Sequence, residues 1–188
     1  MGFPAGFLAT PRLPDSSTPR LFDSSADQIA SHIGRGCGAV CVRPSTDYWS
    51  LASWTCDRLF SALQARRLPV FCLERLVGLE QVGELATRFP SLPIIVAGVT
   101  YRQQRTLLPL LEAFPRLHLS LGSNYTVHRG IEELVSIVGP DRLLFGTGFP
   151  QAESMAAITQ LMYAEISNDD KQLIGAANLR RLISEIER

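Results

Sequence analysis

The feature that most constrains this chain is a regular alternation of short apolar segments with longer segments of helical spacing. Short apolar segments lie at residues 3–9, 38–43, 68–73, 92–97, 116–121 and 142–145. Helical spacing of apolar residues is found at 25–33, 47–67, 79–89, 107–114 and 131–138, and two more helices are expected before the end of the chain. Continuous apolar strands between helices are typical of a parallel sheet covered on both faces. The sequence therefore predicts a single α/β domain over residues 1–188, with about six parallel strands.

The length of the chain decides which parallel-sheet architecture is expected. A complete (β/α)8 barrel takes about 250 residues, and this chain has 188. We expect an incomplete TIM-like barrel that lacks about two of the eight units. The alternative is an open doubly wound sheet, but no glycine-rich phosphate fingerprint follows any predicted strand. The glycines at 34, 36 and 38 precede a strand and indicate a turn.

Composition removes several classes of partner. Lysine plus arginine and aspartate plus glutamate both number 18, so no net field attracts nucleic acid or an anionic membrane. No apolar run approaches the roughly 20 residues that span a bilayer. The N-terminus has no positive segment ahead of its apolar residues, and the four cysteines form no CxxC pair. We expect free thiols in a cytoplasmic protein, without nucleic-acid or membrane partners.

Three segments together resemble the amidohydrolase-related family of TIM-barrel hydrolases and decarboxylases. Residues 138–150 read VGPDRLLFGTGFP, which is similar to the family's last barrel strand, G-x-D-R-hydrophobic-x-F-G-[ST]-D-[YF]-P. The tail at 166–183 resembles the family's closing segment, which ends in N-A-x-R-L. The segments LPVFCLE, FPSLPIIVAG and FPRLHLSLGS match family strands and their lead-ins. The resemblance implies that residue 3 lies in the third barrel strand, so that the first two strands, with the family's His-x-His metal pair, are absent.

The same resemblance locates the family's metal and catalytic positions in this chain, and none of them carries a donor atom. Leu73 and Gly98 stand where the family has histidines, and Gly148 stands where it has an aspartate. A hydrolytic metal site needs several nitrogen or oxygen ligands around an ion that keeps a position for water. The resemblance implies zinc or another divalent metal, whereas the residues present predict no metal and no other cofactor.

The remaining candidates for chemistry are few. His32 and His128 are expected at the surface. His118 alternates with leucines and is either a satisfied core histidine or, less in keeping with its place early in a strand, a catalytic one. No G-x-S-x-G nucleophile motif is present. A small-molecule pocket is expected instead at the carboxyl ends of the strands, where barrel ligands bind. Its candidate residues are Arg43, Glu74, Thr100, Tyr101, Asn124 and Thr147. The charges of Arg43 and Glu74 are expected either to line this pocket or, the preferred interpretation, to pair with each other.

Two functional hypotheses follow. The first is a non-catalytic amidohydrolase-like protein with a binding, assembly or regulatory role. The alternative is a hydrolase or decarboxylase for a small organic substrate, with an unrecognised site or one completed by a companion chain. In either case an incomplete barrel leaves sheet edges open. We expect a homodimer or a partner protein to cover these edges, unless residues 12–25 and the C-terminal helices do so.

Overall fold

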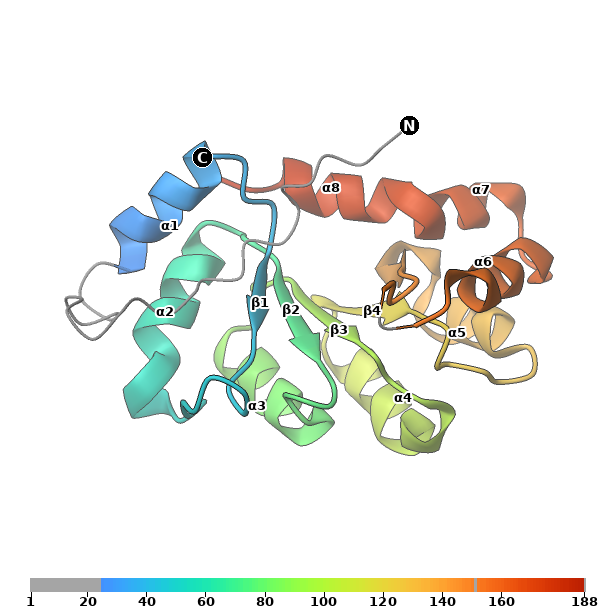
Figure 1. Ribbon diagram of the computed structural model, residues 1–188, viewed down its shortest axis with the longest axis horizontal. Helices are drawn as coiled ribbons and strands as arrows, with labels where there is room; N and C mark the ends of the chain where they lie inside the picture. The colour runs from blue at the N-terminus through green and yellow to red at the C-terminus, as the bar shows by residue number, and fades with distance from the viewer. Residues whose placement is uncertain (1–24, 151, 188) are drawn as a thin grey trace.

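The computed structural model describes residues 25–150 and 152–187, and these form one curved parallel sheet with helices on both sides (Figure 1). The sheet has five strands in the order β1-β2-β3-β4-β5, and every neighbouring pair is parallel. The strands are β1 (Val40–Val42), β2 (Val70–Leu73), β3 (Ile94–Ala97), β4 (Leu117–Leu121) and β5 (Leu143–Phe145). This confirms the predicted α/β class and the incomplete barrel. The sixth strand, expected at residues 3–9, lies outside the described residues.

Helices alternate with the strands along the chain, as expected for βα units, and three α-helices follow the last strand. They are α1 (Ser25–Gly34), α2 (Ser53–Ala65), α3 (Leu79–Arg88), α4 (Gln104–Ala113), α5 (Gly130–Val138), α6 (Ser154–Tyr163), α7 (Asn168–Gln172) and α8 (Asn178–Ser184). A π-helical turn, Leu173–Ala177, joins α7 to α8, so that the two run as one long segment (Figure 1). No helix within the described residues is long and apolar enough to cross a membrane.

The main hydrophobic core lies between the outer face of the sheet and the helices α2 to α5. Alternate strand residues such as Val70, Cys72 and Val96 are fully buried there, as are Phe60 of α2 and Leu107 of α4. Alternation with a period of two sends every second side chain of a strand to the same face. The core forms because the apolar face of each helix meets the apolar outer face of the strands.

The inner face of the sheet carries two rows of side chains, as the interior of a barrel does. The strand pairing places Cys41, Phe71, Ile95 and His118 in the first row and Leu73, Ala97, Ser120 and Leu144 in the second. Helix α8 packs on this face, where Leu182 is fully buried against Ile95 and Leu144. Helix α8 thus fills part of the interior of the incomplete barrel.

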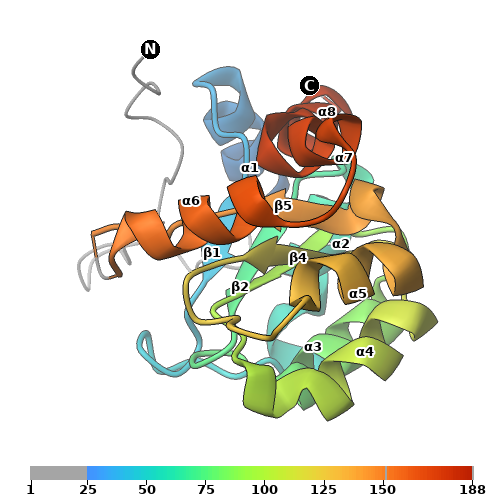
Figure 2. The ribbon, with the colours of Figure 1, turned by 90° about the vertical axis from the view of Figure 1, so that its right-hand side faces the viewer.

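Helix α8 also spans the sheet from its last strand back to its first. At its start, the side-chain amide of Asn178 donates to the Leu143 carbonyl at the beginning of β5 (2.8 Å). At its end, the Glu187 amide donates to the Arg66 carbonyl ahead of β2 (2.9 Å), and an added Cβ on Gly38 would lie 3.5 Å from Ile183. Figure 2 shows α7 and α8 above the sheet, with α1 beyond them. The C-terminal segment therefore ties together the two sides of the incomplete barrel.

The start of the helix predicted over residues 47–67 needs correction, whereas the start of the last helical segment agrees with the sequence. The helix expected over 47–67 begins only at Ser53, because Tyr48 takes a positive φ of 54° and the chain turns there. Its buried face uses Cys56, Phe60 and Leu63, while Trp54, an apolar residue within the predicted helix, is 85% exposed. The residues Ser167-Asn-Asp-Asp170 have the pattern of a helix N-cap, and the Ser167 hydroxyl accepts from the Asp170 amide (3.0 Å), as that pattern predicts.

Candidate functional site

The six residues proposed from the sequence all follow the carboxyl ends of strands, which lie at one end of a parallel sheet. Arg43 comes directly after β1, Glu74 directly after β2, and Thr147 two residues after β5. The topology therefore brings them to the same rim, as expected. Whether they bind a ligand stays a prediction, because no contact among them marks a formed site within the described residues.

The charges at this rim do not pair as predicted. Arg43 forms its ion pair with Asp47, at 3.3 Å between Nη2 and Oδ1, and not with Glu74. Asp47 lies four residues further on, in the turn that leads to α2, so a local partner is nearer than the next strand. Within the described part of the chain the half-buried Glu74 carboxylate has no ion-pair or hydrogen-bond partner. Glu74 is therefore the one candidate whose charge is uncommitted at the rim.

The polar residues at the rim are held locally rather than aimed at a common point. The Thr100 hydroxyl and amide both donate to the Gln103 side-chain oxygen, at 3.0 and 2.7 Å, and this closes the turn before α4. The Thr147 hydroxyl accepts from the Phe149 amide (3.2 Å), and Asn124 is exposed. Tyr101 is half exposed and lines a shallow hollow along α4 on the outside of the barrel.

The three positions where the resemblance implies metal ligands do not fit a metal ion. Leu73 lies in the second inner row, level with Ala97, and offers only carbon. Gly98 and Gly148 are exposed and have φ values of +78° and +74°. Residues with a Cβ rarely adopt such conformations, so the backbone here has the geometry of glycine as well as its missing side chain. Nowhere in the described ranges do three or more His, Cys, Asp or Glu side chains gather to hold a metal.

His118, in the first inner row, is a buried titratable side chain inside the incomplete barrel. It is 2% exposed, and neither ring nitrogen has a hydrogen-bond partner among the described residues. Burial, helped by the guanidinium groups of Arg116, Arg181 and Arg142, lowers the pKa of His118 to about 4. The ring is therefore neutral at physiological pH. Since it lies near the amino end of its strand, away from the rim, it belongs to the core as expected, but its ring nitrogens lack the hydrogen bonds that a satisfied core histidine would have.

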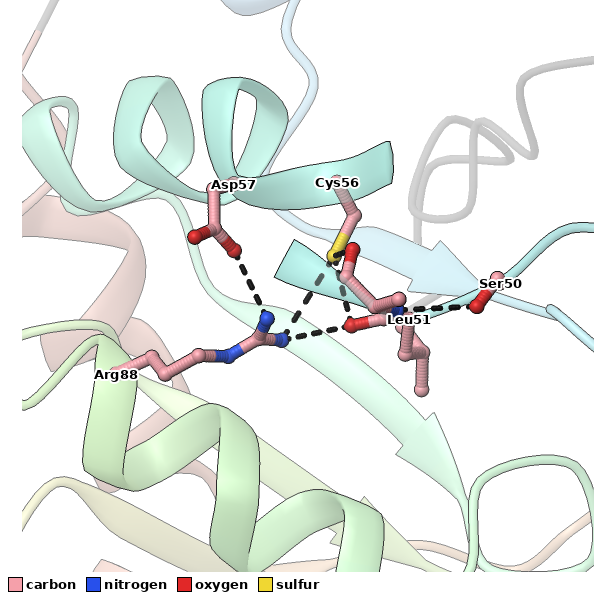
Figure 3. Close-up of polar contacts among 6 residues, drawn as sticks. Ser50, Leu51, Cys56, Asp57 and Arg88 are labelled. Atoms are coloured by element: carbon pink, nitrogen blue, oxygen red, sulfur yellow. Dashed lines mark hydrogen bonds and ion pairs between the residues drawn. The ribbon is translucent and has the colours of Figure 1, made fainter. Parts of the chain in front are cut away.

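A dense polar cluster is found in the outer layer, between α2 and α3 (Figure 3). Arg88 at the end of α3 donates to the Asp57 carboxylate (2.9 Å) and to the Leu51 carbonyl (2.8 Å), and approaches the Cys56 sulfur (3.7 Å). Its guanidinium also lies 5.5 Å from the centre of the Phe89 ring. These contacts join the start of one helix to the end of another, so the cluster is structural. Sequence reasoning missed it, because no motif links two residues 31 positions apart.

Two of the three segments that carry the family resemblance, the last strand and the tail, contact each other directly. Asn178 is 1% exposed and donates to the carbonyls of Pro140 and Leu143, at 2.8 Å each. Arg181 donates to the Asp141 carbonyl (3.0 Å), and Arg142 donates to the Phe114 carbonyl (3.0 Å). The recognisable residues of the last strand and the tail therefore secure α8 to β5. These contacts have a structural role.

Comparisons with known proteins agree with this architecture. A family model described as amidohydrolase matches residues 2–183. No curated protein matches the chain. Among solved structures, an uncharacterized TIM-barrel protein from Bordetella bronchiseptica is similar, with a TM-score of 0.70 and 18% identity over 85% of this chain and 61% of that one.

Two decarboxylases of known structure show the same similarity. The 5-carboxyvanillate decarboxylase from Sphingomonas paucimobilis has a TM-score of 0.65 and 14% identity, over 86% of this chain and 63% of that one. A dihydroxybenzoic acid decarboxylase from a Polaromonas species, solved with manganese and an inhibitor, has a TM-score of 0.62 and 17% identity, over 85% and 64%. At these identities the likeness shows the fold alone. The chain spans less than two thirds of the length of all three structures.

Proposed function

Since the chain belongs to the amidohydrolase family, we propose that it is a non-catalytic member, a pseudoenzyme that retains the family scaffold for binding, assembly or regulation. The observation that carries the proposal is the contrast between two sets of family positions. The positions that fasten β5 to α8 keep their residues and their hydrogen bonds. The positions that the resemblance assigns to metal ligands are Leu73, Gly98 and Gly148, which have no donor atoms.

The backbone supports the proposal independently of the side chains. Replacing Gly98 or Gly148 by a histidine or an aspartate places a Cβ on a residue with positive φ. The left-handed conformation costs residues other than glycine on the order of 1 kcal/mol. An added Cβ at Gly148 would also lie 3.2 Å from that of Ala152. The backbone at these two positions favours glycine, so a single substitution to histidine or aspartate would restore a metal ligand only with backbone strain.

In a ligand-binding role, the residues at the rim would bind a small molecule without catalysing a reaction. Arg43 and Glu74 place opposite charges at the ends of adjacent strands, and the Glu74 carboxylate has no partner within the described residues. A small molecule with a cationic or hydrogen-bond-donating group fits that carboxylate best. The cytoplasmic location expected from the free thiols stays a prediction.

An active hydrolase or decarboxylase is the alternative, and the similarity to two decarboxylases is what favours it. Such a site would need ligands from outside the described residues, for instance from a companion chain with the first barrel strands. Even then the three donor-free positions would remain, so completion supplies at most part of the family's ligand set.

The test is an activity screen on the purified full chain, loaded with zinc or manganese. Carboxyvanillate and dihydroxybenzoates serve as substrates for decarboxylation, and aromatic lactones serve for hydrolysis. We expect no turnover above the metal-only background. Turnover that a chelator abolishes and the metal restores would overturn the proposal in favour of the alternative.

A further inference from the structure

Helix α6 presents apolar side chains on both of its faces, although only one face is buried. Ala157 and Leu161 point into the fold, and they are 4% and 9% exposed. On the other side, Met155, Ile158 and Met162 are 59%, 38% and 65% exposed. Their spacing of i, i+3 and i+7 places them in one stripe. A helix that is apolar all round is normally buried on all sides, so this stripe lacks a cover among the residues that the structure describes.

The composition of α6 strengthens this conclusion. Between Glu153 and Glu165 the sequence SMAAITQLMYA contains no charged residue. Tyr163, 83% exposed, extends the apolar surface at the end of the helix. Solvated helix faces normally carry charges, and exposed large apolar patches mark interaction sites. The stripe and Tyr163 together, called the α6 face below, expose roughly 500 Å², as judged from the size of such side chains.

We propose that the α6 face is a homodimer interface, in which α6 of one copy packs antiparallel against α6 of a second copy. A two-fold axis brings the same patch of both subunits together. The α6 face suits this arrangement because it has no charge that would meet its own copy. A standard interface buries about 800 Å² per partner, so the α6 face supplies most of the area and residues at its margin supply the rest.

The start of α6 carries the Glu153 carboxylate, and its end carries Lys171 together with the Arg129–Glu165 ion pair (2.9 Å), so an antiparallel orientation can bring Glu153 of one copy near a cation of the other. At its start, the Glu153 carboxylate accepts from the amides of Met155 and Ala156 (2.8 and 3.2 Å). At its end, Lys171 donates to the Met162 carbonyl (2.8 Å). Antiparallel packing places the Glu153 end of one copy beside the Lys171 end of the other. The opposed helix dipoles add to this preference.

Among the described elements, the position of α6 leaves the face accessible. The helix follows β5, the last strand of the open sheet, and it lies at the front of the molecule in Figure 2, away from α2, α3 and α4. Pairing there does not require the rim residues. The dimer is therefore independent of whether the protein is a pseudoenzyme or an enzyme.

The experiment is sedimentation velocity on the full chain over a range of micromolar concentrations. We expect a dimer for the wild type. The double variant I158E/M162E should be a monomer, or should dissociate with a Kd at least 100-fold higher, because it buries like charges at the two-fold axis. The milder M162Q should raise the Kd about tenfold. Far-ultraviolet circular dichroism confirms folding, which exposed substitutions leave intact, and M162Q serves if the double variant does not fold.

A matched control separates the α6 face from general stickiness. Trp54 on α2 is 85% exposed and is as apolar as the substituted residues. W54E should leave the dimer unchanged. A monomeric wild type, a dimer that persists with the same Kd in I158E/M162E, or a dimer broken by W54E but not by M162Q would each overturn the proposal.

Discussion

Acid should destabilise this protein through His118, and the size of the effect follows from its burial. The pKa of His118 is lowered to about 4 in the folded chain, against an ordinary value of 6.5, because the ring is desolvated and faces guanidinium groups. Below pH 6.5 the His118 ring binds a proton in the unfolded chain, whereas in the folded chain it stays neutral until the pH approaches 4. Stability is therefore complete above pH 6.5 and falls as the pH drops from 6.5 towards 4. With 1.36 kcal/mol per pKa unit, the loss at pH 4.5 is roughly 2–3 kcal/mol.

The variant H118L isolates this contribution. Leucine fills a similar volume and removes two buried ring nitrogens that have no partner, so its stability at pH 7 should equal or exceed that of the wild type. Urea unfolding, followed by tryptophan fluorescence at pH 7 and pH 4.5, gives the free energy of unfolding of both proteins. Acid-sensitive carboxylates such as Glu132 and Glu185, whose pKa values are lowered, affect both alike. Equal losses of stability in the two proteins would refute the reasoning.

Two further predictions concern the scaffold and the glycine positions. N178A should lower the free energy of unfolding by about 2–3 kcal/mol, because it leaves the buried Leu143 carbonyl and the partly buried Pro140 carbonyl without their donor; urea denaturation checks this, and a loss below 0.5 kcal/mol would contradict it. G98A should cost about 1 kcal/mol through its positive φ alone, since nothing lies within 4 Å of the added Cβ. G175A, also without neighbours but in a helical segment, should be neutral or stabilising, so equal effects of the two alanines would count against the strain at Gly98.

The fold could be predicted from the sequence because the strands of a parallel sheet and the helices that cover it have distinct patterns of apolar residues. Segments such as 68–73 and 92–97 are rich in apolar residues, and the apolar residues that give 79–89 its helical spacing are all buried: Leu79, Val82, Leu85, Ala86 and Phe89. The beginning of α2 was wrong because the turn at Tyr48 depends on a backbone conformation that the apolar spacing does not reveal. The strand at 3–9 stays a prediction outside the described residues.

The candidate site was predictable in position but not in its contacts. The order of parallel strands brings Glu74 and Thr147 to one rim, whatever their side chains do. The partner of Arg43 could not be predicted, because the choice between Asp47 and Glu74 depends on the path of the loop after β1. The role of Asn178 was equally hidden. Its motif was recognisable, but only the structure shows that it fastens α8 to β5 and not a ligand to the rim.

The most direct test of the central claim is the metal content of the purified chain after incubation with excess zinc or manganese and removal of unbound ions. Elemental analysis gives the number of ions per chain. Because Leu73, Gly98 and Gly148 provide no donor atoms, we expect far less than one ion per chain, with the same thermal unfolding midpoint with metal and with a chelator. One tightly retained ion per chain, together with a midpoint that the chelator lowers, would contradict the account.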